Sequence, residues 1–208
     1  MCLVGGILGV YALLLRGGNF GSAQTGNLIE MLISGLEGNF INALLRLIAM
    51  VLYGASLVAA YLLVKSYKGD VRRLCIAVEV VGIAIEGMIP LSVHPIVALY
   101  PIFFVTAFQW GVFSGAKGYV SATIFSTNNM KQMLFGWTEY VRTKDQSQKD
   151  RALFYTKTLA FFHTGVIVGY VIIQLWAAQA IWICMLPLCS ALGLTALERV
   201  GALARADA

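Results

Sequence analysis

The chain has 208 residues, of which 59% are hydrophobic and only 12% are charged. Soluble proteins contain about 45–50% apolar and about 25% charged residues, and a chain this short cannot hide the excess in its core. This composition excludes an ordinary soluble protein and predicts a surface that faces lipid. The formal net charge is +5, but the basic residues are few and lie between apolar segments, so no nucleic-acid partner is expected.

About six apolar segments are candidates for transmembrane helices, each of which needs roughly 20 residues, and the first of them is short. We predict these spans at residues 1–15, 41–64, 74–93, 96–116, 153–176 and 178–197. Barrel strands alternate between apolar and polar residues, whereas these segments are continuously apolar. The sequence therefore predicts an all-α fold, a polytopic transmembrane helix bundle that forms a single domain over residues 1–208.

The connections between these spans are predicted to be short turns or charged loops. His94 and Pro95 form a tight turn, and residues 143–151 form a charged loop. Two shorter apolar pieces, 28–36 and 130–141, follow polar interruptions. The sequence leaves open whether these pieces re-enter the membrane or lie at its interface.

The distribution of Lys and Arg predicts the orientation. Basic residues gather at 65–73, at 117–151 and in the tail, and with six spans all three regions fall on one side. The positive-inside rule assigns that side, and both termini with it, to the cytoplasm. Arg16 is the exception, because it lies near the outer end of the first span.

Two polar interruptions resemble each other and indicate an internal repeat. They occupy residues 16–32 and 117–134, and the triplet Thr25-Gly26-Asn27 aligns with Thr127-Asn128-Asn129. An odd number of spans per repeat makes the second copy inverted, with repeats at about 1–95 and 96–200. Inverted repeats with broken helices are typical of secondary transporters. The alternative is that both interruptions are interfacial loops, with Thr25 and Thr127 as helix caps.

The segment GGILGVYALLLRGGNFGSAQTGNLIEML resembles the start of the YoaK-like family, which are bacterial six-helix membrane proteins of unknown function. The family pattern matches Gly17-Gly18-Asn19-Phe20, the first triplet, Gln109, and Thr127 with Asn129, and Glu79 stands where the family often has a Glu. The resemblance implies the fold and a multi-pass location in the bacterial inner (cytoplasmic) membrane. It implies no substrate.

Three positions depart from the family pattern. Gly9 stands where the family often has an acidic residue, Trp110 replaces an Asn, and Asn128 replaces the Gly of the second triplet. If these polar groups bind something in the family, this chain binds less of it or something different.

Ionisable residues inside the spans are candidates for proton coupling, because a charge at the bilayer centre costs about 2.5–3.5 kcal/mol on insertion scales. Glu79 and Glu86 are seven residues apart and so share one helix face, and His163 lies in the fifth span. The alternatives are that Glu79 pairs with a neighbouring helix, that Glu86 reaches the outer headgroups, and that His163 is a satisfied core histidine.

The leading hypothesis is a secondary transporter or permease for a small solute. Its substrate-binding residues are predicted to be Gln24, Thr25, Asn27, Gln109, Thr127 and Asn129, with Glu79, His163 and Glu86 for proton coupling. No catalytic motif, metal-ligand spacing or cofactor motif is apparent, so the chain is not expected to be an enzyme or to bind a metal or cofactor.

The sequence is compatible with two other functions. A membrane-embedded enzyme for an apolar substrate would use Glu79, Glu86 and His163 as its acid–base set. A non-catalytic scaffold or sensor would associate within the bilayer, and the Gly111–Gly115 spacing is compatible with a homodimer. The partners expected from sequence are thus the lipid bilayer, a small solute and a second copy of the chain.

Overall fold

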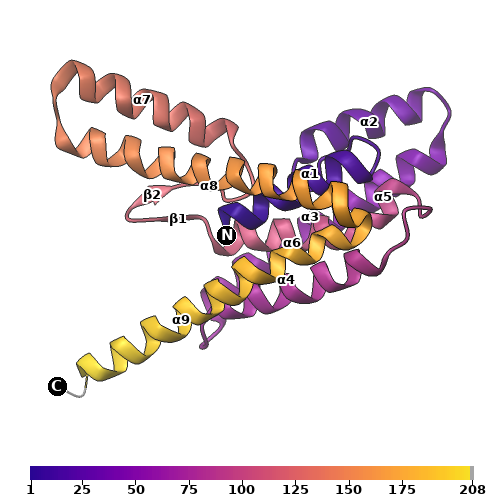
Figure 1. Ribbon diagram of the computed structural model, residues 1–208. Helices are drawn as coiled ribbons and strands as arrows, with labels where there is room; N and C mark the ends of the chain where they lie inside the picture. The colour runs from indigo at the N-terminus through magenta and orange to yellow at the C-terminus, as the bar shows by residue number, and fades with distance from the viewer. Residues whose placement is uncertain (207–208) are drawn as a thin grey trace.

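The computed structural model describes the backbone of residues 1–206 and the side chains of residues 1–198, and this part of the chain is helical apart from one short β hairpin (Figure 1). The elements are α1 (Cys2–Leu15), α2 (Gln24–Leu36), α3 (Phe40–Ser66), α4 (Val71–Met88), α5 (Pro95–Ala98), α6 (Tyr100–Val112), β1 (Gly115–Ala116), β2 (Tyr119–Val120), α7 (Thr127–Thr143), α8 (Gln146–Trp176), the 3-10 helix η1 (Ala177–Cys184) and α9 (Met185–Ala206).

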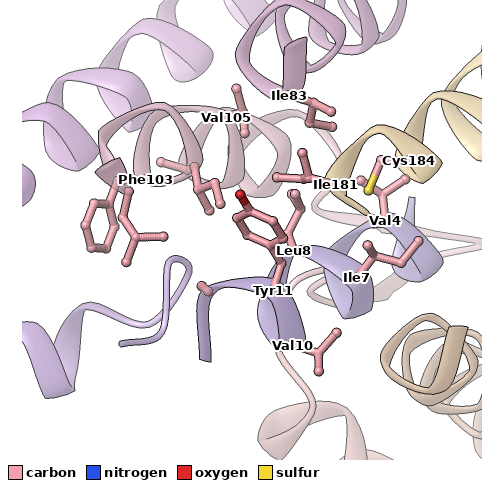
Figure 2. Packing of buried hydrophobic residues seen from close by; sticks show 14 of the residues in the cluster. Val4, Ile7, Leu8, Val10, Tyr11, Ile83, Phe103, Val105, Ile181 and Cys184 are labelled. Atoms are coloured by element: carbon pink, nitrogen blue, oxygen red, sulfur yellow. The ribbon is translucent and has the colours of Figure 1, made fainter. Parts of the chain in front are cut away.

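Helix α1 lies at the centre of the core. Its residues from Val4 to Leu8 and from Val10 to Ala12 are buried, as expected for a helix that is apolar on every side. In Figure 2, Leu8 and Tyr11 of α1 point toward residues of α4, α6 and η1, whereas Val10 points to the opposite side. Glycines allow the closest contacts, because a Cβ on Gly6 would collide with the Phe162 carbonyl oxygen of α8.

The packing of the helices is reciprocal between the two halves of the chain. Helix α1 packs along α8, and α6 packs along α3. Helices α2 and α3 form one hairpin, and α7 and α8 form another. The two hairpins extend in opposite directions, to the right and to the left in Figure 1.

The two-stranded hairpin follows α6. Gly115 pairs with Val120 and Ala116 with Tyr119 in antiparallel register. Lys117 and Gly118 form the turn, both with positive φ values of 54° and 80°, which is the conformation that a two-residue turn of type I′ requires.

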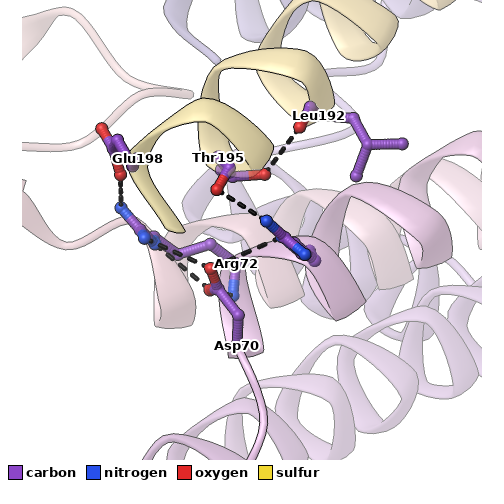
Figure 3. Close-up of polar contacts among 6 residues, drawn as sticks. Asp70, Arg72, Leu192, Thr195 and Glu198 are labelled. Carbon is purple, nitrogen blue, oxygen red and sulfur yellow. Dashed lines mark hydrogen bonds and ion pairs between the residues drawn. The ribbon is translucent and has the colours of Figure 1, made fainter. Parts of the chain in front are cut away.

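Helix α4 is tied to α9 by polar contacts near the start of α4 (Figure 3). Asp70 caps α4 by accepting from the Arg72 backbone N–H at 3.0 Å. The Arg72 guanidinium reaches the Glu198 carboxylate at 2.8 Å, and Arg73 donates to the Thr195 carbonyl at 2.7 Å. These contacts join segments that are 122 to 126 residues apart.

Two helical segments are long and apolar enough to cross a membrane within the described residues. One is Phe40–Ser66, and the other is the continuous helical segment Gln146–Glu198. Large apolar side chains on these segments point outward rather than into the core, among them Val51, Val58, Ile167 and Leu175, each at least 59% exposed. Exposed apolar area of this extent marks a surface for lipid or another protein.

Several predicted boundaries are wrong. Residues 146–151 begin α8 rather than belonging to a loop, because the Asp145 side chain caps the helix by accepting from Ser147 N–H. The span expected at 74–93 ends at Met88, two residues before Pro90. The span at 96–116 is divided into α5 and α6 and ends at Val112, and 178–197 begins as a 3-10 helix.

The Gly111–Gly115 pair does not form a helix-packing motif. Helix α6 ends at Val112 and Gly115 lies in β1. Gly111 contacts Ala60 of α3, in the same chain. The homodimer therefore stays a prediction, and the Gly111–Gly115 spacing no longer supports it.

Candidate functional site: a cavity between two helix breaks

The first break, residues 16–23, connects α1 to α2 and packs against α6. Gly17 and Gly18 have φ values of 65° and 76°, which favour glycine. Gly21 lies so close to α6 that a Cβ would collide with Ile102. The Thr106 hydroxyl of α6 lies 3.1 Å from the Gly21 carbonyl oxygen and 2.7 Å from the Ile102 carbonyl of its own helix, so a polar side chain of the second half contacts the backbone of the first.

The second break, residues 113–126, packs against α1 in return. A Cβ on Gly5 of α1 would collide with the Thr123 carbonyl oxygen. Asn129 satisfies three backbone groups of the break: its Oδ1 accepts from Ala122 N–H at 3.3 Å, and its Nδ2 donates to the Ala122 and Phe125 carbonyls at 2.7 and 2.8 Å. Buried backbone that leaves a helix needs such partners.

A cavity of 370 Å³ lies between the two breaks. The first break contributes Phe20, Ser22 and Ala23, the second contributes residues 124–126, and Thr127 is the first residue of α7. Helix α1 contributes Gly9, Val10 and Leu13, and α8 contributes Phe162 and Val166. The walls are thus mainly apolar, with hydroxyl groups from Ser22, Ser126 and Thr127.

A second, more polar cavity of 320 Å³ adjoins the first, and Phe20 and Ala23 line both. Asn27, Glu30 and Arg46 supply its polar groups. Arg46 donates to Asn27 Oδ1 at 3.3 Å and lies 4.0 Å from the Glu30 carboxylate. Asn27 also donates to Gln24 Oε1 at 3.0 Å.

The predicted substrate-binding residues are only partly brought together. Thr127 lines the shared cavity and Asn27 lines the adjoining one. Thr25 is exposed at the start of α2. Asn129 is occupied by the backbone of its break, and Gln109 donates to Thr123 Oγ1 at 2.9 Å and to the Met1 carbonyl at 3.2 Å. The two triplets therefore do not face each other directly, although the two breaks do.

Glu86 forms a buried ion pair with Arg16 at the ends of α1 and α4. Arg16 Nη2 lies 2.9 Å from Glu86 Oε1, and both side chains are almost fully buried. The guanidinium also donates to the carbonyls of Ile89 and Pro90 and to the Tyr11 hydroxyl. Arg16 is not among the site residues predicted from the sequence, although its position at the end that carries few basic residues was the signal that it has a partner.

Glu79 is fully buried between α4 and its neighbours. The Cys75 thiol one turn earlier lies 3.7 Å from Glu79 Oε1, and Oε2 has no hydrogen-bond partner among the described residues. A buried carboxyl without a cation is favoured in its protonated, neutral form. Glu79 and Glu86 share a helix face, as predicted, but their surroundings differ.

His163 lies apart from both glutamates. It is exposed on α8, its Nδ1 lies 2.8 Å from the Leu159 carbonyl, and its ring contacts Phe162 edge to face. The acid–base set of Glu79, Glu86 and His163 does not converge. Among the described residues, moreover, no three His, Cys, Asp or Glu side chains are grouped as a metal site requires.

Comparison with known proteins gives a family but no relative of known function. No curated protein and no solved structure matches the chain. A family model described as a protein of unknown function, DUF1275, matches residues 1–194, and the YoaK-like proteins fall within it. Since the match covers nearly the whole sequence, the chain belongs to the DUF1275 family.

Proposed function

We propose that the chain is a secondary transporter for a small solute, which binds in the 370 Å³ cavity between the two breaks. The observation that carries this proposal is that both breaks supply walls of one cavity. Broken helices whose irregular backbone lines a cavity are the usual setting of transporter binding sites. In the lipid region such backbone is tolerated only where protein or cavity water satisfies it.

The reciprocal packing supports two inverted repeats. In chain order, α1, the first break, α2 and α3 correspond to α6, the second break, α7 and α8. The first break packs on α6 through Gly21, and the second packs on α1 through Gly5. Helix pairs α1–α8 and α6–α3 correspond in the same way. In alternating access, one set would move against the other around the cavity.

Helix lengths support breaks at membrane depth. Helix α1 has 14 residues and therefore rises about 21 Å, less than the roughly 30 Å of a bilayer core. The first break must complete the crossing. The α3–α4 connection, the β hairpin and the α7–α8 connection, all of which carry basic residues, lie toward the left in Figure 1, whereas the α2–α3 connection lies toward the right. This arrangement supports a multi-pass inner-membrane protein with the left end in the cytoplasm.

The lining of the cavity suggests a solute class. No charged side chain is among its lining residues, and its polar groups are hydroxyls. A small uncharged or weakly polar molecule that accepts or donates hydrogen bonds fits such a site. Of the three candidates for proton coupling, Glu79 has the best support, because Glu86 is held by Arg16 and His163 faces outward.

The test is reconstitution into liposomes that contain a pH indicator, followed by a screen of uncharged solutes such as sugars and polyols. We expect at least one solute to change the internal pH, and Glu79→Gln to abolish this change. Glu37→Gln, at an exposed residue on the α2–α3 connection, is the matched control and should behave as wild type. If radiolabelled solutes do not move at all, the transporter proposal is wrong; if they move equally in Glu79→Gln, only the coupling role is wrong.

A further inference from the structure

A separate cavity of 660 Å³ lies between the β hairpin and α8. Its rim carries Lys117 from the hairpin turn and Lys157 from α8, together with Asp150. Its apolar wall includes Phe154 and Phe161. No residue of this cavity lines the cavity between the breaks.

The hairpin that carries Lys117 is held firmly against α8. The Tyr155 hydroxyl donates to the Val120 carbonyl at 2.7 Å, and the Tyr119 and Phe154 rings lie 5.2 Å apart. The turn at Lys117-Gly118 has the positive φ values of a defined two-residue turn. The cavity is therefore preformed rather than created by a mobile loop.

The rim carries unneutralised positive charge. Among the described residues, neither Lys117 nor Lys157 forms a salt bridge. Asp150 is the one acidic residue in the lining, and Gln146 donates to it at 3.4 Å. Two ammonium groups against one carboxylate leave a net positive site for an anion.

The cavity also spans a change from polar to apolar surface. Lys157 is the last charged residue of α8, and the chain carries no Asp, Glu, Lys or Arg from Thr158 to Leu197. Phe161, one turn after Lys157, is 59% exposed. A ligand that fills this site therefore needs an anionic end at the lysines and an apolar part along Phe161.

We propose that this cavity binds one anionic phospholipid, with its phosphate between Lys117 and Lys157 and an acyl chain along Phe154 and Phe161. Basic pockets beside helices on the cytoplasmic side of a membrane suit such headgroups. A free phosphate ion would leave the apolar wall unused. The proposal rests on the membrane location proposed above and is independent of transport.

The test is native mass spectrometry of the protein released from nanodiscs that contain phosphatidylglycerol and phosphatidylcholine. Wild type should retain phosphatidylglycerol preferentially. Lys117→Ala with Lys157→Ala should lower its retention about five-fold per lysine and roughly twenty-five-fold in total. Arginine at both positions should restore it. The control Lys68→Ala with Lys131→Ala removes equal charge from exposed positions outside the cavity and should retain the lipid.

Two outcomes would overturn the proposal. If both double variants lost phosphatidylglycerol equally, its retention would depend on general surface charge and not on this cavity. Displacement of phosphatidylglycerol by millimolar inorganic phosphate would identify a phosphate site rather than a lipid site. Neither outcome bears on the liposome assay, so failure here and failure of the transporter proposal are distinguishable.

Discussion

Arg16 Nη2 and Glu86 Oε1 lie 2.9 Å apart although the two residues are 70 positions apart in the sequence. The pair joins the end of α1 to the end of α4, and Arg16 also donates to the Ile89 and Pro90 carbonyls. It therefore closes the end of the bundle at which the first break begins. This explains how a basic residue is accommodated on the side of the protein that otherwise carries little positive charge.

Removing one partner of this pair should be strongly destabilising. Arg16→Met leaves the Glu86 carboxylate buried without a cation, which costs about 3–5 kcal/mol, whereas Arg16→Met with Glu86→Leu removes both charges and should recover most of that loss. Thermal unfolding in detergent measures these losses of stability. If the loss in the double variant equalled the sum of the losses in the two single variants, the pairing would be contradicted.

Glycines of α1 should differ sharply in their tolerance of alanine. Gly5→Ala and Gly6→Ala place a Cβ against the backbone of the second break and of α8, so each should destabilise the protein by about 1–3 kcal/mol. Gly9 faces the shared cavity, and its nearest neighbour would lie 3.9 Å from a Cβ. Gly9→Ala should therefore unfold at the wild-type temperature. An equal loss of stability in all three variants would show that the room for a Cβ does not determine which glycines tolerate alanine.

Alanine substitutions at the adjacent residues Asn128 and Asn129 should have different effects on stability. Asn129→Ala leaves buried backbone groups of the second break without partners, and each such group costs about 1–3 kcal/mol. Asn128 is exposed, so Asn128→Ala should change stability by less than about 0.5 kcal/mol. Unfolding of the two variants side by side measures the difference. Similar losses of stability in the two variants would mean that the hydrogen bonds of Asn129 do not stabilise the second break.

The cap of α4 predicts a dependence on acidity. Partial burial would raise the pKa of Asp70, but hydrogen bonds from Arg72 and the charges of Arg72 and Arg73 outweigh it and lower the pKa below its usual 3.8. The ionised, folded form is therefore favoured above pH 3.8, and this stabilisation is lost as the pH falls through the lowered pKa. Asp70→Asn should narrow the difference between unfolding temperatures at pH 6 and pH 3 relative to wild type. If the difference in unfolding temperature were the same in Asp70→Asn and wild type, ionisation of Asp70 would not contribute to stability.

Local patterns of the sequence predicted much of the fold. The span expected at 41–64 is α3, and the apolar pieces at 28–36 and 130–141 lie within α2 and α7. The misplaced boundaries depended on single caps or turns, such as Asp145 and the positive φ of Ala177. The six-span bundle and the inverted repeats stay predictions, because the described helices include only two segments that meet the length and hydropathy of a span.

The candidate site was less accessible to sequence analysis. The triplets marked the breaks, but Asn27 and Asn129 mainly hold other groups in place. Phe20 of the Gly-Gly-Asn-Phe motif and Ser22 line the cavity, although neither was predicted to bind substrate. The partner of Arg16 depends on where α4 ends relative to α1. Such long-range proximity is set by packing and leaves no local periodic signal.

The most direct test of the shared cavity is two-sided labelling of single cysteines. In a variant with its four native cysteines replaced, Ala23→Cys places a thiol on the first break and Thr127→Cys places one at the end of the second break, where α7 begins. Glu37→Cys and Arg142→Cys serve as controls for the two sides. Alternating access predicts that a membrane-impermeant maleimide labels both cavity positions in right-side-out and in inverted vesicles, whereas each control reacts in one orientation. Labelling of each break from one side only would contradict a common, alternately open site.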